Sequence, residues 1–253
     1  MKLRELLAGV PICADSADLE MEISGVSYDS RTTRPGDLFV AMTGFATDGH
    51  QYIAKALANG AAAVLCQRRP AEACAYVQTE DSRRALAVIG GNWFGHPAEE
   101  MTMIAVTGTC GKTTTTYLLK AILEQARGVK VGLIGTNQNM IGSDVIPTER
   151  TTPESFEVQK LFREMADAGC THVVMETSSH ALYLDRVYGV RYDVGIFTNL
   201  TQDHLDFHKT MENYCDAKAI LFRNCVTGVV NADDPWTPRL LKDADCKVMT
   251  YAE

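Results

Sequence analysis

The sequence predicts an α/β protein with two domains: a small N-terminal α/β domain, then a mostly parallel sheet flanked by helices. The chain has 253 residues, which is enough for two ordinary domains. Short apolar strands alternate with helical patterns, and a glycine-rich loop ending in Lys-Thr follows one of those strands. We therefore expect one domain over residues 1–98 and a second over residues 99–253.

The first domain shows short strands around one clear helical pattern. We expect strands in 23–31, 36–42 and 61–67, and a helix over 49–60 that Gly60 closes. The stretch 91–101 carries Gly, Pro and acidic residues without periodicity, which favours a domain boundary there.

The second domain repeats a strand, loop and helix pattern. Strands are expected in 103–109, 130–136, 171–180, 192–200 and 225–234, and another strand begins at 246. A helix is expected over 112–128, with an apolar face of Leu118, Ala121, Ile122 and Ala126 and with Gly128 at its end. A second helix over 153–168 carries the stripe Val158, Leu161, Phe162, Met165 and Ala168. Such alternation predicts helices on both faces of a parallel sheet, with ligands at the carboxyl ends of its strands.

The net charge and the cysteine pattern argue against several kinds of partner and site. The net charge of -8 and the pI near 5.3 argue against nucleic acid as the main partner, because phosphate neutralisation needs clustered Lys and Arg. The eight cysteines show neither CxxC pairs nor zinc spacing, which favours small, buried, apolar side chains in a reducing cytosol. No signal-peptide pattern or membrane-length apolar run is present, so we expect a cytoplasmic protein that does not enter a membrane.

The stretch "GTCGKTTTT", Gly108 to Thr116, has the features of a phosphate-binding loop. Glycine lets the backbone approach an anion, Lys112 can reach outer phosphates, and the Thr113 hydroxyl suits magnesium. The longer nucleotide signature would have glycine where this chain has Val106. The setting between a strand and a helix nevertheless favours phosphate binding over a chance match.

Three further residues are expected at the same sheet edge. Glu176 ends one apolar strand and His204 follows the next. A lone acidic residue just after a strand is more commonly solvated, and a lone histidine more commonly has a structural role. Their expected convergence at one edge of the sheet favours a magnesium site instead. Lys218 lies on the apolar stripe of a helix over 211–222. It either snorkels at the helix edge or is a desolvated amine of lowered pKa that reacts with carbon dioxide to form a carbamate, an oxygen ligand for magnesium.

Several motifs in order resemble the Mur ligases of peptidoglycan synthesis, and among them the branch that adds the third residue of the peptide. The motifs are "SYDSRTTRPGDLFVAMTGFATDGHQYI", "GTCGKTTTT", "TTPES", "ETSSHAL", "FTNLTQDHLDFH" and "MENYCDAKAILF". They span both expected domains. In this family the loop has the shorter G-T-x-G-K-T form, so Val106 agrees with the resemblance.

The resemblance implies ATP-dependent amide formation through an acyl phosphate, with magnesium. The ATP-binding residues it implies are Gly108, Thr109, Cys110, Gly111, Lys112, Thr113 and Thr114. It places Thr113 and Glu176 on one magnesium ion, and Glu176, His204 and carbamylated Lys218 on a second. Lys112, Lys218 and His204 would be the catalytic residues.

The resemblance also implies the substrate, UDP-N-acetylmuramoyl-L-Ala-D-Glu, bound from a UDP-sugar-binding N-terminal domain to the central ATP-binding domain. The matching positions are Ser30 for the uridine end and Thr151, Thr152, Ser178 and Arg186 for the remainder. Each hydroxyl, taken singly, also suits a turn or a helix cap, and "TTPES" could cap the helix after it. Leu184 and Phe45 stand where some family members carry glutamine and histidine.

Family members carry a third domain that binds the amino acid, and this sequence stops while a strand is beginning. We therefore expect a truncated chain that is inactive alone, with the choice between meso-diaminopimelate and L-lysine left open, and a monomer by resemblance only. Three alternatives stay open: a ligase of the same fold for another step, for folate or for cyanophycin; a non-catalytic nucleotide- or UDP-sugar-binding module; and a general P-loop ATPase.

Overall fold

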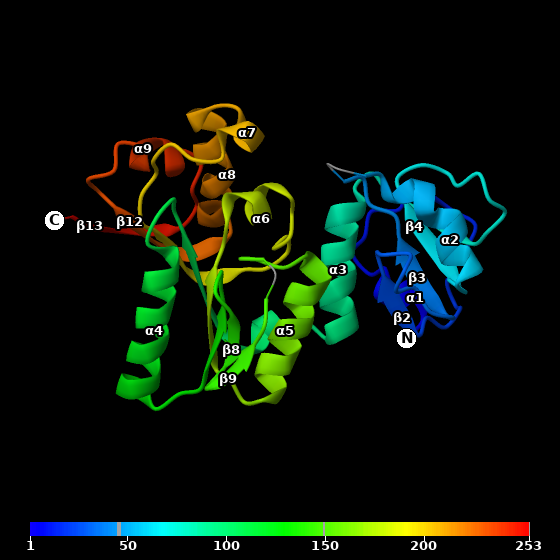
Figure 1. Cartoon of the computed structure of the whole chain (residues 1–253), viewed down its shortest axis with the longest axis horizontal. Helices are drawn as coiled ribbons and strands as arrows, with labels where there is room; N and C mark the ends of the chain where they lie inside the picture. Colours follow the sequence, from blue (N-terminus) through cyan, green and yellow to red (C-terminus); the bar gives the residue numbers. More distant parts are fainter. Residues whose placement is uncertain (45–46, 149, 253) are drawn as a thin grey trace. The chain divides into compact units, whose positions relative to one another are not determined.

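The computed structural model describes residues 1–44, 47–148 and 150–252 (Figure 1). The chain forms two compact units, Met1–Gly95 and His96–Glu253. The division falls inside the stretch 91–101, where the sequence pattern predicts the boundary. Phe45 lies outside the described residues. Within the described part of the chain, no helix has the length and apolar character needed to cross a membrane.

The first unit is built on a five-stranded sheet in the order β1-β5-β4-β3-β2. Its strands are β1 Ala14–Asp15, β2 Gly25–Ser27, β3 Asp37–Val40, β4 Ala63–Cys66 and β5 Tyr76–Gln78; its helices are α1 Leu3–Leu6, the 3-10 helix η1 Gly49–Tyr52, α2 Ile53–Ala58 and α3 Ser82–Phe94. In the described part of this unit, β1 is the one strand of the sheet that runs antiparallel to its neighbour. Every residue of β3 and β4 is buried, so these two strands form the centre of the core.

Helix α3 corrects the expectation of a structureless boundary. The side chain of Asp81 accepts the backbone N–H groups of Arg83 and Arg84 and so begins the helix. The helix continues through Gly90 and Gly91 and ends at Gly95, whose φ is +73°. Residues 91–94 are therefore helical. Glycine pairs usually weaken a helix, but both of these are buried, where tertiary packing outweighs propensity.

The second unit contains an eight-stranded sheet in the order β13-β12-β11-β6-β10-β7-β8-β9. Its strands are β6 Thr102–Thr107, β7 Val131–Ile134, β8 Asn139–Ile141, β9 Asp144–Ile146, β10 His172–Glu176, β11 Tyr192–Phe197, β12 Cys225–Asn231 and β13 Lys247–Tyr251. Its helices are η2 Pro97–Glu100 (3-10), α4 Lys112–Arg127, α5 Ser155–Asp167, α6 Ser179–Tyr183, α7 Leu205–His208, α8 Met211–Arg223 and α9 Thr237–Leu240. The strands from β13 to β7 are parallel, and β8 and β9 add an antiparallel hairpin. The predicted fold class, a mostly parallel sheet flanked by helices, is confirmed (Figure 1).

Helices cover both faces of this sheet. One face packs against α5 and α8 in a cluster that includes Phe162, Met165 and Phe222. The other packs against α4 through Val131 and Val174. The stripe predicted for α5 is buried from Val158 to Met165, whereas Ala168, the residue that ends the helix, is exposed.

The predicted apolar face of α4 is wrong. Leu118 and Ile122 are 58% and 57% exposed, and Ala121 and Ala126 are exposed as well. Leu119 and Leu123 pack against the sheet instead. Adjacent apolar pairs, 118–119 and 122–123, make two stripes of equal helical spacing, and only the position of the sheet decides between them.

Candidate phosphate and metal site

The order of the strands brings four strand ends to one edge of the sheet. β10 lies between β6 and β7, and β11 lies on the other side of β6. Because these strands are parallel, the phosphate loop after β6 lies beside the segments that follow β7, β10 and β11. Glu176, the last residue of β10, pairs in register with Val106 of β6.

The loop needs glycine at Gly108. Its φ is +147°, and a Cβ there would come within 1.9 Å of Thr198 Oγ1. Asn199 holds the two loop residues that follow Gly108. Its backbone oxygen accepts the N–H of Thr109 (2.8 Å), and its Oδ1 accepts the N–H of Cys110 (3.0 Å). The loop is therefore held against the end of β11 by close backbone contact.

Helix α4 supplies an anion-binding end. Gly111 precedes the helix with φ +86°, and the N–H of Thr115 donates to the Gly111 carbonyl at 2.9 Å. The N–H groups of the residues before Thr115 have no intrahelical acceptor, because they belong to the first turn. Together with the positive end of the helix dipole, they form a site suited to phosphate.

Lys112 folds back over the loop. Its Nζ donates to the carbonyl oxygens of Gly108 and Thr109, each at 2.9 Å. Burial lowers the pKa of the Lys112 amine, while the carboxylate of Glu176 opposes that change. The amine is thus partly desolvated and close to where a phosphate would meet the helix end.

Glu176 is completely buried, and its carboxylate accepts hydrogen bonds from three donors. Its Oε2 accepts the hydroxyls of Thr113 and Thr136 at 3.0 Å each, and its Oε1 accepts the N–H of Thr136 at 2.9 Å. A carboxylate beside a threonine hydroxyl is the all-oxygen donor set that magnesium prefers. The residues fit a magnesium ion on this chemistry. Among the described residues, no group of three His, Cys, Asp or Glu side chains could hold a metal ion.

Lys218 faces inward, as one of the two sequence interpretations requires. The side chain is 1% exposed, its Nζ donates to the carbonyl of Gly108 at 2.9 Å, and the amine lies 4.5 Å from the ring centre of Tyr214. Burial first, and the charge of Lys112 second, lower its pKa well below the ordinary value. The snorkelling interpretation is wrong, because α8 packs this face against the sheet.

His204 lies nearby but is less constrained. It has φ +52° at the start of α7, its side chain is 47% exposed, and Nε2 is 3.4 Å from Asp203 Oδ2. Its ring meets that of His180 edge-on with centres 4.8 Å apart. Within the described residues, no hydrogen bond or ion pair joins it to Glu176 or Lys218. Its role as a metal ligand stays a prediction.

Four of the predicted substrate residues lie together beside Glu176. The Thr151 and Thr136 hydroxyls are 3.0 Å apart, and the Thr152 hydroxyl donates to the Glu176 carbonyl at 2.9 Å. Arg186 Nη1 donates to the Thr152 carbonyl at 3.2 Å. Ser178 caps α6 by accepting the N–H of Ala181 at 3.1 Å.

The prediction that these hydroxyls cap helices is confirmed at one position and wrong at another. Ser178 does cap a helix, α6. The stretch "TTPES" does not cap the helix that follows it, because α5 begins after Glu154 without a side-chain cap.

Ser30 belongs to the first unit, where it is 5% exposed and its carbonyl oxygen accepts a hydrogen bond from Asn59 Nδ2 at 2.7 Å. Leu184, the other departure from the family pattern, follows α6.

The structure adds residues that sequence reasoning missed. Thr136 and Asn199 stand just beyond strand ends, which was the available signal. His180 and His208 have rings 5.4 Å apart, and His208 Nε2 lies 3.0 Å from Ser179 Oγ. Burial, aided by the nearby cations, lowers the pKa of His208 to about 4. All eight cysteines are free, but the expected burial is wrong for Cys13 and Cys110, which are exposed, and only partial for Cys74 and Cys246.

Comparison with known proteins shows the family of the chain. The family description "Mur ligase middle domain" matches residues 106–253, and "Mur ligase family, catalytic domain" matches residues 22–93. The chain belongs to the Mur ligase family. Within this Mur ligase chain, the phosphate loop, Glu176 and Lys218 all lie in the middle-domain match.

Two curated relatives from Clostridium share one name. A UDP-N-acetylmuramoyl-L-alanyl-D-glutamate--2,6-diaminopimelate ligase of Clostridium tetani is 46% identical over 257 residues, covering 100% of this chain and 53% of the relative. The ligase of the same name from Clostridium botulinum is 51% identical over 235 residues, covering 91% and 48%. This Mur ligase chain thus spans about half the length of the curated relatives it matches.

Solved structures agree on the fold. A structure of a UDP-N-acetylmuramoyl-L-alanyl-D-glutamate--2,6-diaminopimelate ligase matches with a TM-score of 0.84 and 28% identity, covering 100% of this chain and 52% of that one. A Thermotoga maritima MurF ligase in complex with ADP matches with a TM-score of 0.60 and 23% identity, covering 90% and 50%. The second likeness concerns the fold alone.

Proposed function

We propose that the chain is the substrate- and nucleotide-binding part of an ATP-dependent ligase that adds the third amino acid to UDP-N-acetylmuramoyl-L-Ala-D-Glu. The observation that carries this proposal is the buried Glu176, bonded to Thr113 of the phosphate loop. A general phosphate loop explains that contact, but not the Thr151, Thr152 and Arg186 side chains next to the same carboxylate. A phosphorylated carboxylate substrate explains both.

The chemistry requires activation of a carboxylate. A carboxylate oxygen of the substrate attacks the γ-phosphorus of ATP, the bond to the β–γ bridging oxygen breaks, and ADP leaves. The amine of the incoming amino acid then adds to the carbonyl carbon of the acyl phosphate, loses a proton, and the tetrahedral intermediate expels inorganic phosphate. Lys112 and the N–H groups at the start of α4 offset the phosphate charge during transfer. Magnesium held by Thr113 and Glu176 would neutralise further charge on the phosphate oxygens.

The buried Lys218 supports a carbamate. Lys112 and Lys218 both donate to the carbonyl oxygen of Gly108 at 2.9 Å. Burial, together with the unfavourable presence of a positive charge on both amines at once, lowers the pKa of Lys218. A neutral Lys218 amine attacks carbon dioxide and loses a proton, forming a carbamate. The product is an anion beside Lys112, with oxygen atoms for a second magnesium ion that Glu176 and His204 would share.

For the amino acid we propose 2,6-diaminopimelate, because the relatives' names state it. UDP-sugar binding by the first unit, through Ser30, and nucleotide and dipeptide binding by the second, through Gly108–Thr114, Thr151, Thr152, Ser178 and Arg186, complete the proposal. ATP and magnesium are its cofactors.

The test is calorimetric titration of the chain with UDP-N-acetylmuramoyl-L-Ala-D-Glu, beside a Ser30→Ala, Arg186→Ala double variant. We expect saturable binding that weakens by at least about tenfold in the variant, since Arg186 offers a charged hydrogen bond. Equal binding by both proteins would contradict the assigned residues. ATP turnover without any UDP-sugar would instead favour a general ATPase, and binding without ligation after supply of a C-terminal domain would favour a non-catalytic module.

A further inference from the structure

Two of the eight free cysteines lie together in the second unit. Cys225 is the first residue of β12 and is 8% exposed, and Cys246 stands directly before β13, partly buried against the same apolar cluster. Because β12 and β13 run parallel, both thiols lie at the amino ends of neighbouring strands. The phosphate loop follows the carboxyl end of β6, so this pair lies away from it and the proposed ligation does not use it.

Two glycines leave room for the two sulfur atoms. Gly195 of β11 and Gly228 of β12 pair in register, so they lie side by side on neighbouring strands. A Cβ on Gly195 would come 3.0 Å from Cys225 Sγ, and a Cβ on Gly228 would come 2.9 Å from Cys246 Sγ. Each sulfur therefore lies over one of two adjacent backbone positions on the same face of the sheet.

The two thiols also differ in how readily they react. Burial raises the pKa of Cys225 to about 12, and the second cause is the neighbouring Cys246, through its charge and through a hydrogen bond between the two side chains. At neutral pH Cys225 is therefore a protonated thiol, whereas the thiolate is the form that attacks a disulfide. Cys246, the less buried of the two, is then the sulfur expected to react first with an oxidant in solution.

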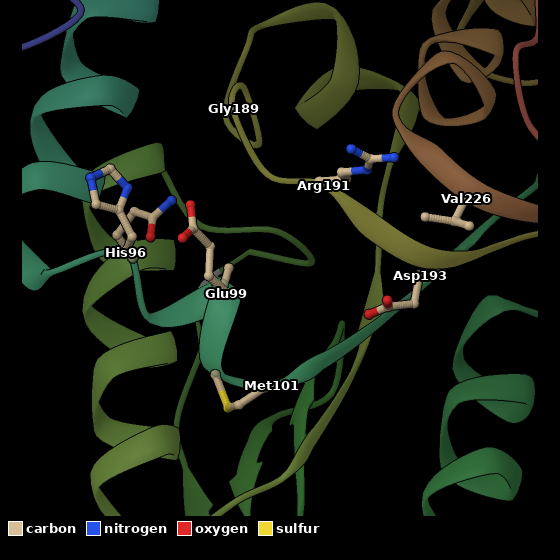
Figure 2. A pocket seen from close by; sticks show the side chains of 9 residues that line it. His96, Glu99, Met101, Gly189, Arg191, Asp193 and Val226 are labelled. Atoms are coloured by element: carbon tan, nitrogen blue, oxygen red, sulfur yellow. The ribbon is translucent and has the colours of Figure 1, made fainter.

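The surface beside this pair is open. Figure 2 shows Val226, the residue after Cys225, together with Asp193 of β11 at the side of a pocket of about 300 Å³. The amino ends of β11 and β12 therefore border solvent, and a small oxidant can approach this end of the sheet. Cys246 lies at the same end, because β13 runs parallel to β12.

We propose that Cys225 and Cys246 form a reversible disulfide, with a low-molecular-weight disulfide such as oxidised glutathione as the oxidant. The Cys246 thiolate attacks one sulfur of the oxidant, whose S–S bond breaks and releases one thiolate. Cys225 then loses its proton and attacks the Cys246 sulfur of this mixed disulfide, which releases the second thiolate. The two protein thiols are oxidised to one disulfide, and the oxidant is reduced to two thiols.

The bridge fixes the outermost strand of the described sheet. All five residues of β13 are exposed, so few apolar contacts hold this strand in place. A covalent link at its amino end limits the opening of β13, and it closes a loop over 226–245, which restricts the unfolded chain. Disulfides of reducing compartments are commonly transient and redox-sensing. The pair thus makes the stability of this edge depend on the redox state of its surroundings.

The test is incubation of the folded chain with oxidised glutathione at millimolar concentration, followed by alkylation of the remaining thiols, digestion and mass spectrometry. We expect a cross-linked peptide pair that contains Cys225 and Cys246. It should form in preference to a link between Cys66 and Cys74, which also share one apolar cluster. Oxidation should raise Tm by at least about 3 °C and slow hydrogen exchange in β13, and dithiothreitol should reverse both effects.

Single substitutions separate the two steps of the reaction. In Cys225→Ser, Cys246 should stop at the mixed disulfide, which adds one glutathione to its peptide. In Cys246→Ser, Cys225 should stay reduced because it is buried, and neither variant should show the rise in Tm. Cys225→Ala repeats the test without a buried hydroxyl, in case the serine prevents folding. Cys170→Ala, at another buried cysteine of the same cluster, is the matched control and should still form the bridge.

Three outcomes would overturn the inference. The first is glutathione on Cys246 of the parent chain at the level seen in Cys225→Ser. The second is a Cys225–Cys246 link no more frequent than the link between Cys66 and Cys74. The third is a chain in which both thiols stay reduced although the exposed Cys110 reacts.

A bridge that forms without any change in Tm or in hydrogen exchange would contradict its effect on β13. These results leave the proposed ligase function untouched, because that function is tested with the UDP-sugar and concerns the other ends of the strands.

Discussion

At the scale of single residues, a few buried polar side chains account for the chemistry of the site. Glu176 would be costly in the core without its three donors, and Lys218 has a single carbonyl acceptor in an apolar setting. The folded chain is less stable with these two residues than it would be with apolar residues at the same positions. Ligand binding accounts for their placement better than folding does.

Replacing Lys218 with methionine should stabilise the chain. The folded-state pKa is lowered, so the folded chain resists protonation while the unfolded chain gains its proton below about 10.5. The gain from Lys218→Met should therefore grow as the pH falls from 10.5 toward the lowered pKa, and stay constant below it. We expect a rise in Tm of about 2–4 °C at pH 7, measured by calorimetry in carbonate-free buffer.

Lys242→Met is the control for that experiment, because Lys242 lies outside the buried site and should leave Tm unchanged. A pH-independent effect of Lys218→Met would contradict a lowered pKa. Added bicarbonate should change the Tm of the parent chain and have no effect on the Lys218→Met variant.

Replacing Glu176 with glutamine should separate nucleotide binding from magnesium binding. The amide keeps the size of the side chain but loses the charge, so ATP binding in the presence of magnesium should weaken about tenfold or more. Chelation of magnesium should lower the ATP affinity of the parent chain to that of the Glu176→Gln variant. Titration of both proteins with ATP, with and without EDTA, measures this, with Glu212→Gln as control. Equal strengthening by magnesium in both proteins would exclude Glu176 as a ligand.

At the scale of elements, the loop between β6 and α4 is determined by backbone geometry. Gly108→Ala introduces a Cβ 1.9 Å from Thr198 Oγ1 and should cost about 1–3 kcal/mol of unfolding free energy. Gly128→Ala is the matched control: its φ of +63° is unfavourable, but nothing lies within 4 Å. It should cost about 1 kcal/mol. Denaturant unfolding of both variants measures the difference, and equal costs would show that Thr198 moves aside.

The two stripes of α4 make a second prediction at this scale. Leu118→Gln and Ile122→Gln remove exposed apolar surface and should change the unfolding free energy by less than about 0.5 kcal/mol. Leu119→Ala and Leu123→Ala remove contacts with the sheet and should each cost about 1–3 kcal/mol. Chemical denaturation distinguishes the pairs. The opposite ranking would restore the face expected from the sequence.

These elements also show what the sequence can predict. The place of Lys218 on the apolar stripe of α8 could be predicted from the sequence, but its burial could not, because a lysine on such a stripe can also extend to the helix edge; packing of α8 against the sheet decides it. The buried face of α4 could not be predicted, since neighbouring leucines satisfy two stripes equally. The positions of Thr136 and Asn199 just beyond strand ends were a signal in the sequence, but their hydrogen-bond partners were not, because those depend on the order of the strands, in which β10 lies between β6 and β7 and β11 lies beside β6. Periodicity does not encode that order.

At the scale of the whole molecule, the proposed function assigns different parts of the ligands to the two compact units. Nucleotide with magnesium should slow hydrogen exchange in Gly108–Thr116 and at the ends of β10 and β11, and leave Met1–Gly95 unchanged. The UDP-sugar dipeptide should protect parts of both units. Exchange measured by mass spectrometry tests this, and protection of the first unit by nucleotide alone would contradict separate binding.

The carbonyl oxygen of Gly108 accepts hydrogen bonds from the side-chain nitrogens of both Lys112 and Lys218. Under the proposed function, a triphosphate would compete with the backbone oxygens for the Lys112 amine. Binding would then be an exchange of hydrogen-bond partners by a side chain that already lies in the loop. Movement of Lys112 would also take away a charge that, after burial, lowers the pKa of Lys218, and this would couple occupancy of the loop to the proton affinity of the second lysine.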